Sequence, residues 1–458
     1  MIVKSSENSC AEPGQGVIVC KFGGTSMADE SSVRRVEEIV RKNPARRFIV
    51  VSAPGKTPCG RKVTDVLIDC HREISETGHC DASFPEVVER FRGLYCGMSE
   101  LGFLQLMAET KQEMERDGGY DFCISRGEYL SAYFFAKRIG YPFIDASELI
   151  CFGTDGYDEA RTERTCRARL KSESCGVIPG FYGADEKGRI AAFSRGGSDI
   201  SGSIVARAVR AVLYENWTDV DGILDADPRI VPDAKIIERM TYNELRELAY
   251  LGAAVMHPDA LLPLVKGKIP LNVRNTFRPE LPGTLICSVL GPSDKRVVTG
   301  IAGKTDFQVL FVHKIGLNAQ KSVVRKILSV LERHGVLFEH MPSSLDAVNI
   351  IIPNACLSPD IAERIAEEIK ESVKPDDVRI LDNLAIVSIV GRNMFQSVGV
   401  AAKMLTALSE RKINIRMLIQ GCREINVIVG IAESRYREAV NALYDAFLRE
   451  REKILIRS

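Results

Sequence analysis

Residues 17–27 read Val-Ile-Val-Cys-Lys-Phe-Gly-Gly-Thr-Ser-Met, and this stretch decides the fold. Its first four residues are apolar and rich in β-branched side chains, which predicts a buried strand. Lys21 and the Gly23-Gly24 pair follow directly, and a helix is expected to begin after them. Glycines let the backbone approach an anion, and the positive end of a helix adds to the charge of Lys21. The stretch therefore predicts a phosphate site, although its spacing matches neither the Walker loop nor GxGxxG.

A second glycine-rich loop, Ser-Arg-Gly-Gly-Ser-Asp, occupies residues 194–199. Both loops are expected to leave a strand, to enter a helix and to lie at the carboxyl ends of strands, where open α/β sheets bind ligands. Together they offer two cations, Lys21 and Arg195, and several backbone N–H groups. Such a site suits a transferring phosphoryl group, which needs alignment and charge neutralisation. For the first loop alone, an ordinary strand–turn–helix joint with a surface lysine is the alternative.

Length, charge and cysteine usage narrow the class of protein. The chain has 458 residues, too many for one core, so two or three domains are expected. Lys and Arg number 61, as do Asp and Glu, so the formal charge is zero and gives no support for a nucleic-acid or membrane-surface partner. The 13 cysteines are scattered without metal-binding spacing, and together with the lack of a signal peptide they predict reduced thiols in the cytoplasm. No apolar run approaches the roughly 18–20 residues that span a bilayer.

Strands and helices alternate over the first part of the chain, which predicts one α/β domain at 17–295 after a loose tail at 1–16. Strands are expected at 17–20, 48–51, 143–146, 176–181, 191–193, 212–217, 271–276 and 284–286. Beyond residue 300 an internal repeat appears, in which Leu328 and Ile351 match Leu405 and Ile428 with an offset of 77 (405 − 328 and 428 − 351). Each copy predicts the order strand–helix–strand–strand–helix–strand, with domains at 300–381 and 382–458.

Five ordered motifs resemble those of the aspartokinases of the amino-acid kinase family. They are Lys-Phe-Gly-Gly-Thr-Ser at 21–26, Ser-Arg-Gly-Glu at 125–128, the loop at 194–199, Trp-Thr-Asp-Val-Asp-Gly-Ile at 217–223 with Ala-Asp-Pro-Arg at 226–229, and Gly-Ala-Ala-Val-Met-His-Pro at 252–258. The resemblance covers nearly the whole chain after residue 16. It implies an α/β three-layer sandwich with a mainly parallel sheet, followed by tandem ferredoxin-like α+β regulatory domains of the ACT type.

The resemblance also implies a reaction, the transfer of the γ-phosphoryl group of MgATP to the side-chain carboxylate of L-aspartate. The product would be 4-phospho-L-aspartate, at the first step of the lysine, threonine and methionine (diaminopimelate) pathway. A carboxylate is ionised at neutral pH, so no general base is needed, and the cost lies in bringing two anions together. Lys21 would bridge toward the phosphoryl group, and Asp199 would organise the catalytic loop. The alternative for Asp199 is a helix N-cap.

Substrate and nucleotide contacts follow from the same resemblance, residue by residue. Arg195 would bind the α-carboxylate of aspartate and Glu128 its ammonium group, and the further substrate contacts are Ser52, Thr64, Phe181 and Ser198. ATP would contact Lys21, Phe22, Gly23, Gly24, Thr218, Asp219, Leu224, Arg229, Ala254 and Val255. Leu224 stands where an aromatic residue is expected, and Ala254 where many relatives have lysine. ATP implies Mg²⁺, for which no protein ligands can be assigned.

The ACT repeats suggest binding of an amino-acid effector and pairing into a homodimer. Lysine is the leading candidate for feedback inhibition, with threonine or no effector as alternatives. The effector is expected near residues 313–321 and 343–346 of the first repeat. Two rival functions are a different amino-acid kinase, such as a glutamate kinase, and a non-catalytic amino-acid sensor.

Overall fold

The computed structural model describes residues 16–57, 60–94, 99–194, 196–252, 256, 258–291, 294, 296–421 and 425–449. The chain forms two compact units. The first comprises Met1–Ile223, Ile236–Leu245 and Val255–Asp294, and the second Leu224–Lys235, Arg246–Ala254 and Lys295–Ser458. Among the described residues, no helix is long and apolar enough to cross a membrane.

A seven-stranded sheet forms the centre of the first unit. Its order is β5 (Gly176–Pro179), β2 (Arg46–Val51), β1 (Ile18–Phe22), β8 (Leu213–Thr218), β10 (Leu271–Asn275), β11 (Thr284–Cys287) and β9 (Arg239–Thr241). The first five strands are parallel, whereas β11 runs antiparallel to β10 and β9 runs parallel to β11. Parallel neighbours need crossover connections, and helices provide them. The mainly parallel sheet predicted from the sequence is therefore confirmed.

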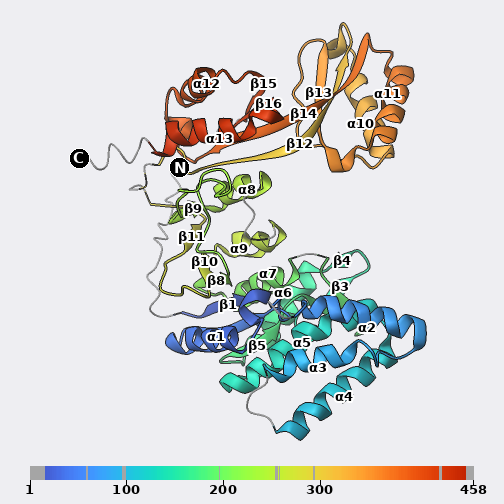
Figure 1. Ribbon diagram of the computed structural model, residues 1–458, viewed down its shortest axis with the longest axis vertical. Coiled ribbons are helices and arrows are strands. Elements are labelled where there is room, and N and C mark those ends of the chain that lie inside the picture. Colours follow the sequence, from blue (N-terminus) through green and yellow to red (C-terminus); the bar gives the residue numbers. More distant parts are fainter. Residues whose placement is uncertain are drawn as a thin grey trace, which may run out of the picture. The chain divides into compact units, whose positions relative to one another are not determined.

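Helices cover both faces of this sheet and give three layers (Figure 1). One face packs against α1 (Glu30–Lys42), α2 (Val63–Thr77), α3 (Phe84–Arg92), α4 (Glu100–Asp117) and α5 (Tyr120–Ile139). The other face carries α7 (Gly197–Ala208), which contacts α6 (Glu159–Leu170) and α9 (Leu261–Gly267). Ile18, Cys20 and Phe22 of β1 belong to the apolar cluster under α1–α5. Because side chains alternate along a strand, Lys21 faces α7.

Several short segments differ from the sequence expectation. The segment at 143–146 contributes only a single bridge, between Phe143 and Val177, instead of a strand. The segment at 191–193 forms β7 (Ile190–Ala192), which pairs with β6 (Tyr182–Ala184) in a separate hairpin and not with the main sheet. A further hairpin, β3 (Phe152–Gly153) with β4 (Gly156–Tyr157), and strand β9 were not expected. Segments of two or three paired residues are too short to carry a readable alternation pattern.

The second unit has one five-stranded antiparallel sheet. Its order is β13 (Ala347–Pro353), β12 (Gly300–His313), β14 (Asp377–Val390), β16 (Asn426–Ala432) and β15 (Ile415–Gln420). The helices are α10 (Val323–Arg333), α11 (Pro359–Val373), α12 (Val400–Glu410) and α13 (Tyr436–Tyr444), while α8 (Tyr242–Tyr250) lies across the boundary of the two units in sequence. The starts of α10 and α12, and of α11 and α13, are each 77 residues apart (400 − 323 and 436 − 359). The helices thus reproduce the repeat read from the sequence.

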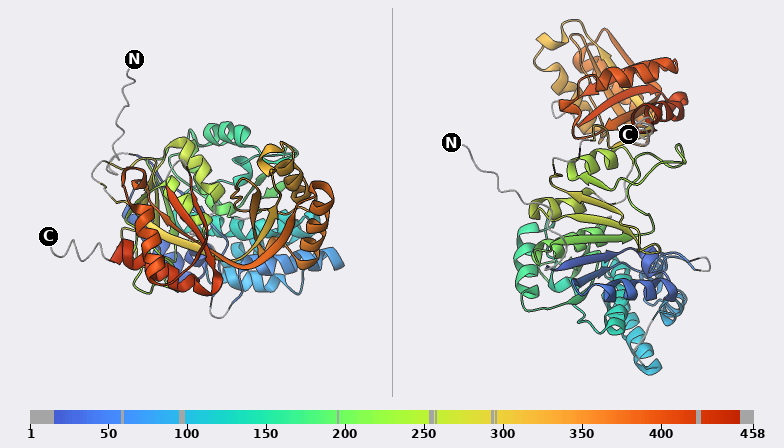
Figure 2. Two further views of the ribbon diagram at one scale, coloured as in Figure 1. Left: turned by 90° about the horizontal axis from the view of Figure 1, so that it is seen from above. Right: turned by 90° about the vertical axis from the view of Figure 1, so that its left-hand side faces the viewer.

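Both copies of the repeat share the two long strands, β12 and β14 (Figure 2). Gly300–Lys304 pairs with the end of β14 at 386–390, whereas residues 307–313 pair with its beginning and with β13. Asp306 and Asn383 have positive φ angles of 68° and 61° at the position where the register shifts. Because Gly300–Lys304 pairs with residues 386–390, this segment is better assigned to the second copy. The domain boundaries 300–381 and 382–458 stay a prediction. The last strand expected in the second copy lies outside the described residues.

Candidate active site

Lys21 and Asp199 form a largely buried ion pair on the α7 face of the sheet. The Lys21 Nζ lies 2.7 Å from the Asp199 Oδ1, and the two side chains are 10% and 14% exposed. Asp199 lies in the first turn of α7, whose N-cap is Gly196 with a φ of 61°. The alternative reading of Asp199 as an N-cap is therefore wrong, because the helix begins two residues before it. The two residues predicted to be catalytic are brought together from positions 178 residues apart (199 − 21).

The first glycine loop is bonded to its neighbours. The Gly23 N–H donates to the carbonyl of Trp217 at 3.1 Å, and the Gly55 N–H donates to the carbonyl of Gly24 at 2.8 Å. A Cβ atom on Gly55 would lie 2.6 Å from the Gly24 carbonyl carbon, so the two loops can only pack this closely without side chains. The expectation that the Gly23 N–H faces an anion is wrong in this structure, since that group extends the pairing of β1 with β8. The turn that follows is a 3-10 turn, Gly24–Met27, and α1 begins only at Glu30.

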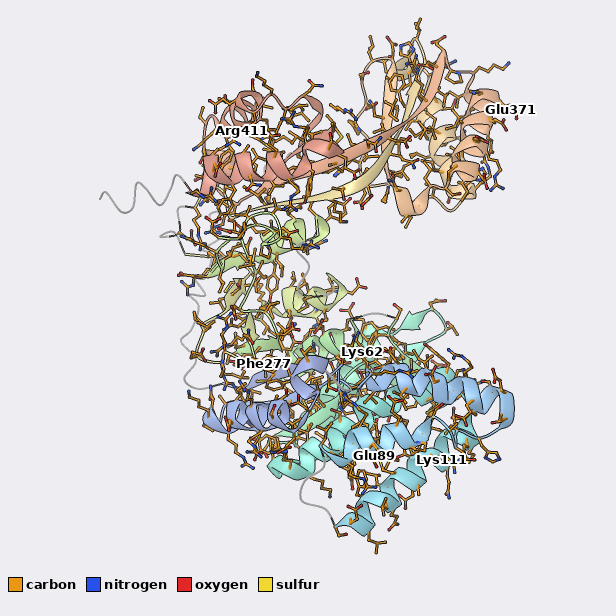
Figure 3. All side chains as sticks on the ribbon, viewed as in Figure 1. Lys62, Glu89, Lys111, Phe277, Glu371 and Arg411 are labelled. Atoms are coloured by element: carbon orange, nitrogen blue, oxygen red, sulfur yellow. The ribbon has the colours of Figure 1, made fainter. Side chains whose placement is uncertain are left out.

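A cavity of about 270 Å³ opens beside the ion pair. Its lining residues come from the ends of β1 and β2, from α2 and α5, from the corner after β5 and from α7: Lys21, Ser52, Thr64, Glu128, Phe181, Gly196, Gly197, Ser198 and Asp199. All five described residues that were predicted to contact substrate line this cavity, while Arg195 lies outside the described residues. Lys62, which precedes α2 and its Thr64, is exposed (Figure 3).

Glu128 places a buried carboxyl group in the cavity. The residue is 6% exposed, and burial raises the pKa of its carboxyl group to about 8. Its Oε2 is buried and has no hydrogen-bond partner among the described residues. The preceding residue, Gly127, packs closely against Ala53, since a Cβ atom on residue 127 would lie 2.8 Å from the Ala53 Cβ. A buried, unpaired carboxylate oxygen fits a ligand ammonium group.

Phe181 closes another side of the cavity in an unusual backbone conformation. Its φ angle is 78°, a left-handed conformation that costs a non-glycine residue roughly 1–2 kcal/mol. The Phe181 N–H donates to the Ser201 Oγ at 3.0 Å, and its carbonyl accepts the Phe193 N–H at 2.9 Å. These bonds hold the ring at the cavity against the local strain.

The residues predicted to bind ATP are less uniformly placed. Phe22 is fully buried and its ring stacks on Trp217 at 5.9 Å, so only its main chain is left for a ligand. Thr218 ends β8, and its Oγ1 donates to the adjacent, exposed Asp219 at 3.2 Å. Thr218 and Asp219 lie at the carboxyl end of β8, which neighbours β1, so they lie at the same edge of the sheet as Gly23.

The remaining predicted nucleotide contacts are in the second unit or outside the described residues. Leu224 and Arg229 belong to the second unit, where the Arg229 guanidinium pairs with Asp227 at 2.7 Å. Ala254 and Val255 lie outside the described residues. Among the described residues no group of three or more His, Cys, Asp or Glu side chains could hold a metal ion.

Asn216 is a buried polar residue of the site that the sequence reasoning missed. It is 1% exposed on β8, where it pairs in register with Lys21, and its Nδ2 donates to the Asp199 Oδ1 at 3.3 Å. The available signal was a polar pair, Glu215-Asn216, inside a strand that otherwise reads as buried. Two adjacent polar residues in a central strand must face opposite sides of the sheet, and each then needs a partner.

The chain is similar to known proteins in sequence and in fold. A model of the amino acid kinase family matches residues 16–275, and a model of the ACT domain matches residues 387–447. Aspartokinase 3 of Bacillus subtilis (strain 168) is 34% identical over 450 residues, which covers 94% of this chain and 98% of that protein. The crystal structure of Clostridium acetobutylicum aspartate kinase is similar with a TM-score of 0.87 and 41% identity, covering 94% of this chain and all of that one. E. coli aspartokinase III, solved with aspartate and ADP, has a similar fold, with a TM-score of 0.71, 24% identity and coverage of 94% and 99%.

Proposed function

The chain belongs to the amino acid kinase family, as an aspartokinase, and from this premise we propose how its residues divide the work of phosphorylating aspartate. The enzyme is a phosphotransferase that uses ATP. In our proposal the side-chain carboxylate of L-aspartate attacks the γ-phosphorus of ATP, the bond to the β,γ-bridging oxygen breaks, and 4-phospho-L-aspartate and ADP result. The observation that supports this most directly is an unpaired, buried carboxyl group, Glu128, in the same cavity as a buried lysine, Lys21.

Glu128 binds the α-ammonium group of aspartate in this scheme, and Arg195 binds the α-carboxylate. Ser52, Thr64 and Ser198 offer hydroxyl groups in the same cavity, and Phe181 supplies an apolar wall. An amino acid presents a cation and an anion on one carbon, so a site for it needs both charges in fixed positions. Aspartate held in this way can direct its second carboxylate toward Lys21.

Lys21 reduces the electrostatic repulsion between the two substrates. Two anions, the acceptor carboxylate and the terminal phosphate, must approach within bonding distance, and a fixed cation in a largely buried site lowers that repulsion more than one in water. Asp199 holds the ammonium group of Lys21 through the 2.7 Å contact. No general base is required, since the attacking carboxylate is already ionised near neutral pH.

The ATP contacts are proposed for the residues that the motifs indicate. The proposed contacts are Lys21, Phe22, Gly23, Gly24, Thr218, Asp219, Leu224, Arg229, Ala254 and Val255, with Phe22 and Gly23 acting only through main-chain carbonyl or Cα groups. Mg²⁺ is proposed to arrive with the nucleotide and to neutralise phosphate charge. The described residues offer no acidic cluster for it, which is compatible with an ion held chiefly by phosphate oxygens and water.

Regulation by lysine through the ACT repeats, within the lysine, threonine and methionine pathway, is a further part of the proposal. The two segments expected to bind the effector lie against each other, since the Gly316 N–H donates to the Asp346 Oδ1 at 2.6 Å and the Lys314 N–H to the Asp346 carbonyl at 2.8 Å. E. coli aspartokinase III has been solved with lysine and aspartate. We also propose a homodimer paired through the ACT repeats, and a cytoplasmic location, in keeping with described cysteines that form no disulfide bonds with one another.

A hydroxamate assay with ATP, aspartate and hydroxylamine tests the reaction, with glutamate in place of aspartate as the control. Lys21→Ala should lower kcat by roughly 100-fold or more, as expected for loss of a transition-state charge contact. Product from glutamate but not aspartate would favour a different amino-acid kinase, and no product from either would favour a sensor. Full activity of Lys21→Ala would overturn the assigned phosphoryl contact. Titration calorimetry with lysine and with threonine identifies the effector, and an absence of heat with lysine would remove that part of the proposal.

A further inference from the structure

Asn216 lies next to the Lys21–Asp199 pair but outside the lining of the cavity. On β8 it is in register with Lys21 of β1 and with Val273 of β10. Side chains in register on neighbouring parallel strands point to the same face, so Asn216 and Lys21 both face α7, where Asp199 lies. Asn216 is 1% exposed, which puts a polar amide in a position where apolar side chains are the rule.

The amide of Asn216 makes a specific contact with the ion pair. Its Nδ2 donates to the Asp199 Oδ1 at 3.3 Å, and the Lys21 Nζ lies 2.7 Å from that same oxygen. The Nδ2 also lies 3.2 Å from the Met256 sulfur, whereas the Asn216 Oδ1 has no partner among the described residues. One carboxylate oxygen therefore accepts from a charged donor and from a neutral one.

The neutral donor matters when the substrates bind. A carboxylate beside a phosphoryl group and a substrate carboxylate is repelled by both, while Lys21 is attracted to both. If Lys21 shifts toward the phosphoryl group, Asp199 loses part of its charged partner at the moment when repulsion is greatest. A buried amide keeps the carboxylate in place without adding charge, whereas a cation there would compete with Lys21 for it.

We propose that Asn216 is a positioning residue for phosphoryl transfer, whose amide fixes the Asp199 carboxylate so that Asp199 can orient Lys21. The inference rests on the proposed function of this site. It assigns Asn216 no contact with either substrate, so its loss should act on kcat more than on the KM for aspartate. Removing a hydrogen bond to a charged group typically corresponds to a change of roughly 10- to 100-fold.

The first test is Asn216→Leu, with similar volume and no amide. We expect kcat to fall roughly 10- to 100-fold with the KM for aspartate changed by less than about threefold. The matched control is Asn272→Leu on β10, which removes a half-buried asparagine in register with Glu215 and hence on the opposite face. That control should leave kcat within about twofold of wild type. An Asn216→Leu enzyme with wild-type kcat would overturn the inference.

The second test is Asn216→Asp, which stays informative if the leucine variant fails to fold. The charged or titratable groups near this position are Lys21 on β1, Asp199 on α7, Tyr214 on β8, whose hydroxyl donates to the Asp199 carbonyl, and Glu128 on α5 across the cavity. Burial beside Asp199 raises the pKa of an introduced carboxyl group, and only its protonated form can donate as the amide does. The kcat of this variant at saturating aspartate, divided by that of wild type, should therefore rise as the pH is lowered from 9 to 6.

The outcomes separate the inference from the function on which it rests. A ratio that does not change with pH would show that position 216 does not act through a donated hydrogen bond. A wild-type enzyme that forms no aspartyl hydroxamate would instead overturn the proposed function. Active wild type, inactive Lys21→Ala and unaffected Asn216 variants would leave the function standing and remove only the role of Asn216.

Discussion

At the residue scale, burial sets the protonation of Glu128. Burial of the carboxyl group raises its pKa, and this effect outweighs the attraction to Lys21, which lowers the pKa. The resulting pKa of about 8 describes the cavity without substrate. An incoming ammonium group stabilises the ionised form, so aspartate binding and loss of the Glu128 proton are linked.

Glu128→Gln should raise the KM for aspartate roughly 10- to 100-fold, because it replaces a charged acceptor by a neutral amide. The effect on the KM for ATP should be small, since Glu128 is assigned to the amino-acid substrate. Steady-state kinetics with each substrate varied in turn measure both constants. Equal increases in the two KM values would contradict the assignment.

The pH dependence of the wild-type enzyme gives an independent check on Glu128. When the pH lies below the Glu128 pKa of about 8, the carboxyl group is mostly protonated and cannot form an ion pair with an ammonium group. The kcat/KM for aspartate should therefore rise with pH and level off above about 8. The kcat/KM of Glu128→Gln should not show this rise with pH. If the variant kept the rise, another group would be responsible for it.

The sequence predicted the site unevenly at this scale, for physical reasons. Lys21, Glu128 and Ser198 follow from motifs whose residue types match the chemistry, and all three line the cavity. Asn216 could not be found in this way, because its partner Asp199 depends on which strand lies beside β1. The Gly23 N–H was assigned to an anion because a linear motif does not show that the Trp217 carbonyl competes for it.

At the element scale, a charged cluster stabilises the sheet on the face opposite the cavity. Glu215 of β8 accepts from Arg46 at 2.8 Å and from the Trp217 indole at 2.9 Å, with Arg274 at 3.6 Å. The two guanidinium groups lie 5.2 Å and 4.6 Å from the Trp217 ring. Because Glu215 and Asn216 are adjacent on β8, one face of the strand carries this cluster and the other face carries the Asn216 contact to Asp199.

Glu215→Gln should destabilise the first unit by about 3–5 kcal/mol, since it leaves Arg46 buried without a counter-charge. Glu89→Gln on α3 is the matched control (Figure 3). The Glu89 side chain is 70% exposed, and it pairs with Arg92 at the surface. That change should cost at most about 1 kcal/mol. Denaturant unfolding followed by circular dichroism measures both, and equal effects would contradict the burial argument.

The strand expected at 17–20 lies at β1, and the helix expected after the glycine pair is α1, which buries Val33, Val36 and Val40. The segments at 143–146 and 191–193 were read as strands of the main sheet from three or four apolar residues. Such short runs do not show which strand, if any, they pair with, so tertiary packing decided their outcome.

At the scale of the whole molecule, the second copy of the repeat connects to the kinase motifs. Ala226, Ile230 and Val231, which flank the predicted ATP contact Arg229, pack in one apolar cluster with Val298 and with residues of β14, α12, β16 and α13. The first copy has an apolar cluster of its own, under α10 and α11. Loss of the second copy would therefore expose the apolar side chains beside Arg229, the predicted ATP contact.

This division predicts the outcome of two deletions. Lys304 and Ile386 are opposite each other in β12 and β14, so replacing residues 305–385 by Asn-Gly closes a two-residue hairpin and removes the first copy. The second copy then keeps Gly300–Lys304 paired with β14, and the variant should fold and phosphorylate aspartate with kcat within about threefold of wild type but without response to the effector.

A chain that ends at residue 381 removes the predicted second copy instead. It leaves Gly300–Lys304 without its partner strand and uncovers Ile230 and Val231, so it should aggregate or melt at a lower temperature and lose activity. Size-exclusion chromatography, thermal melts and the hydroxamate assay compare the two variants. The opposite result, a stable chain ending at 381 and an unfolded Asn-Gly variant, would support the boundary at 381–382 that the repeat spacing predicts. The boundary at 381–382 was predicted from the offset between the two copies along the sequence. That offset does not show that Gly300–Lys304 pairs with β14, a strand about 80 residues further along the chain.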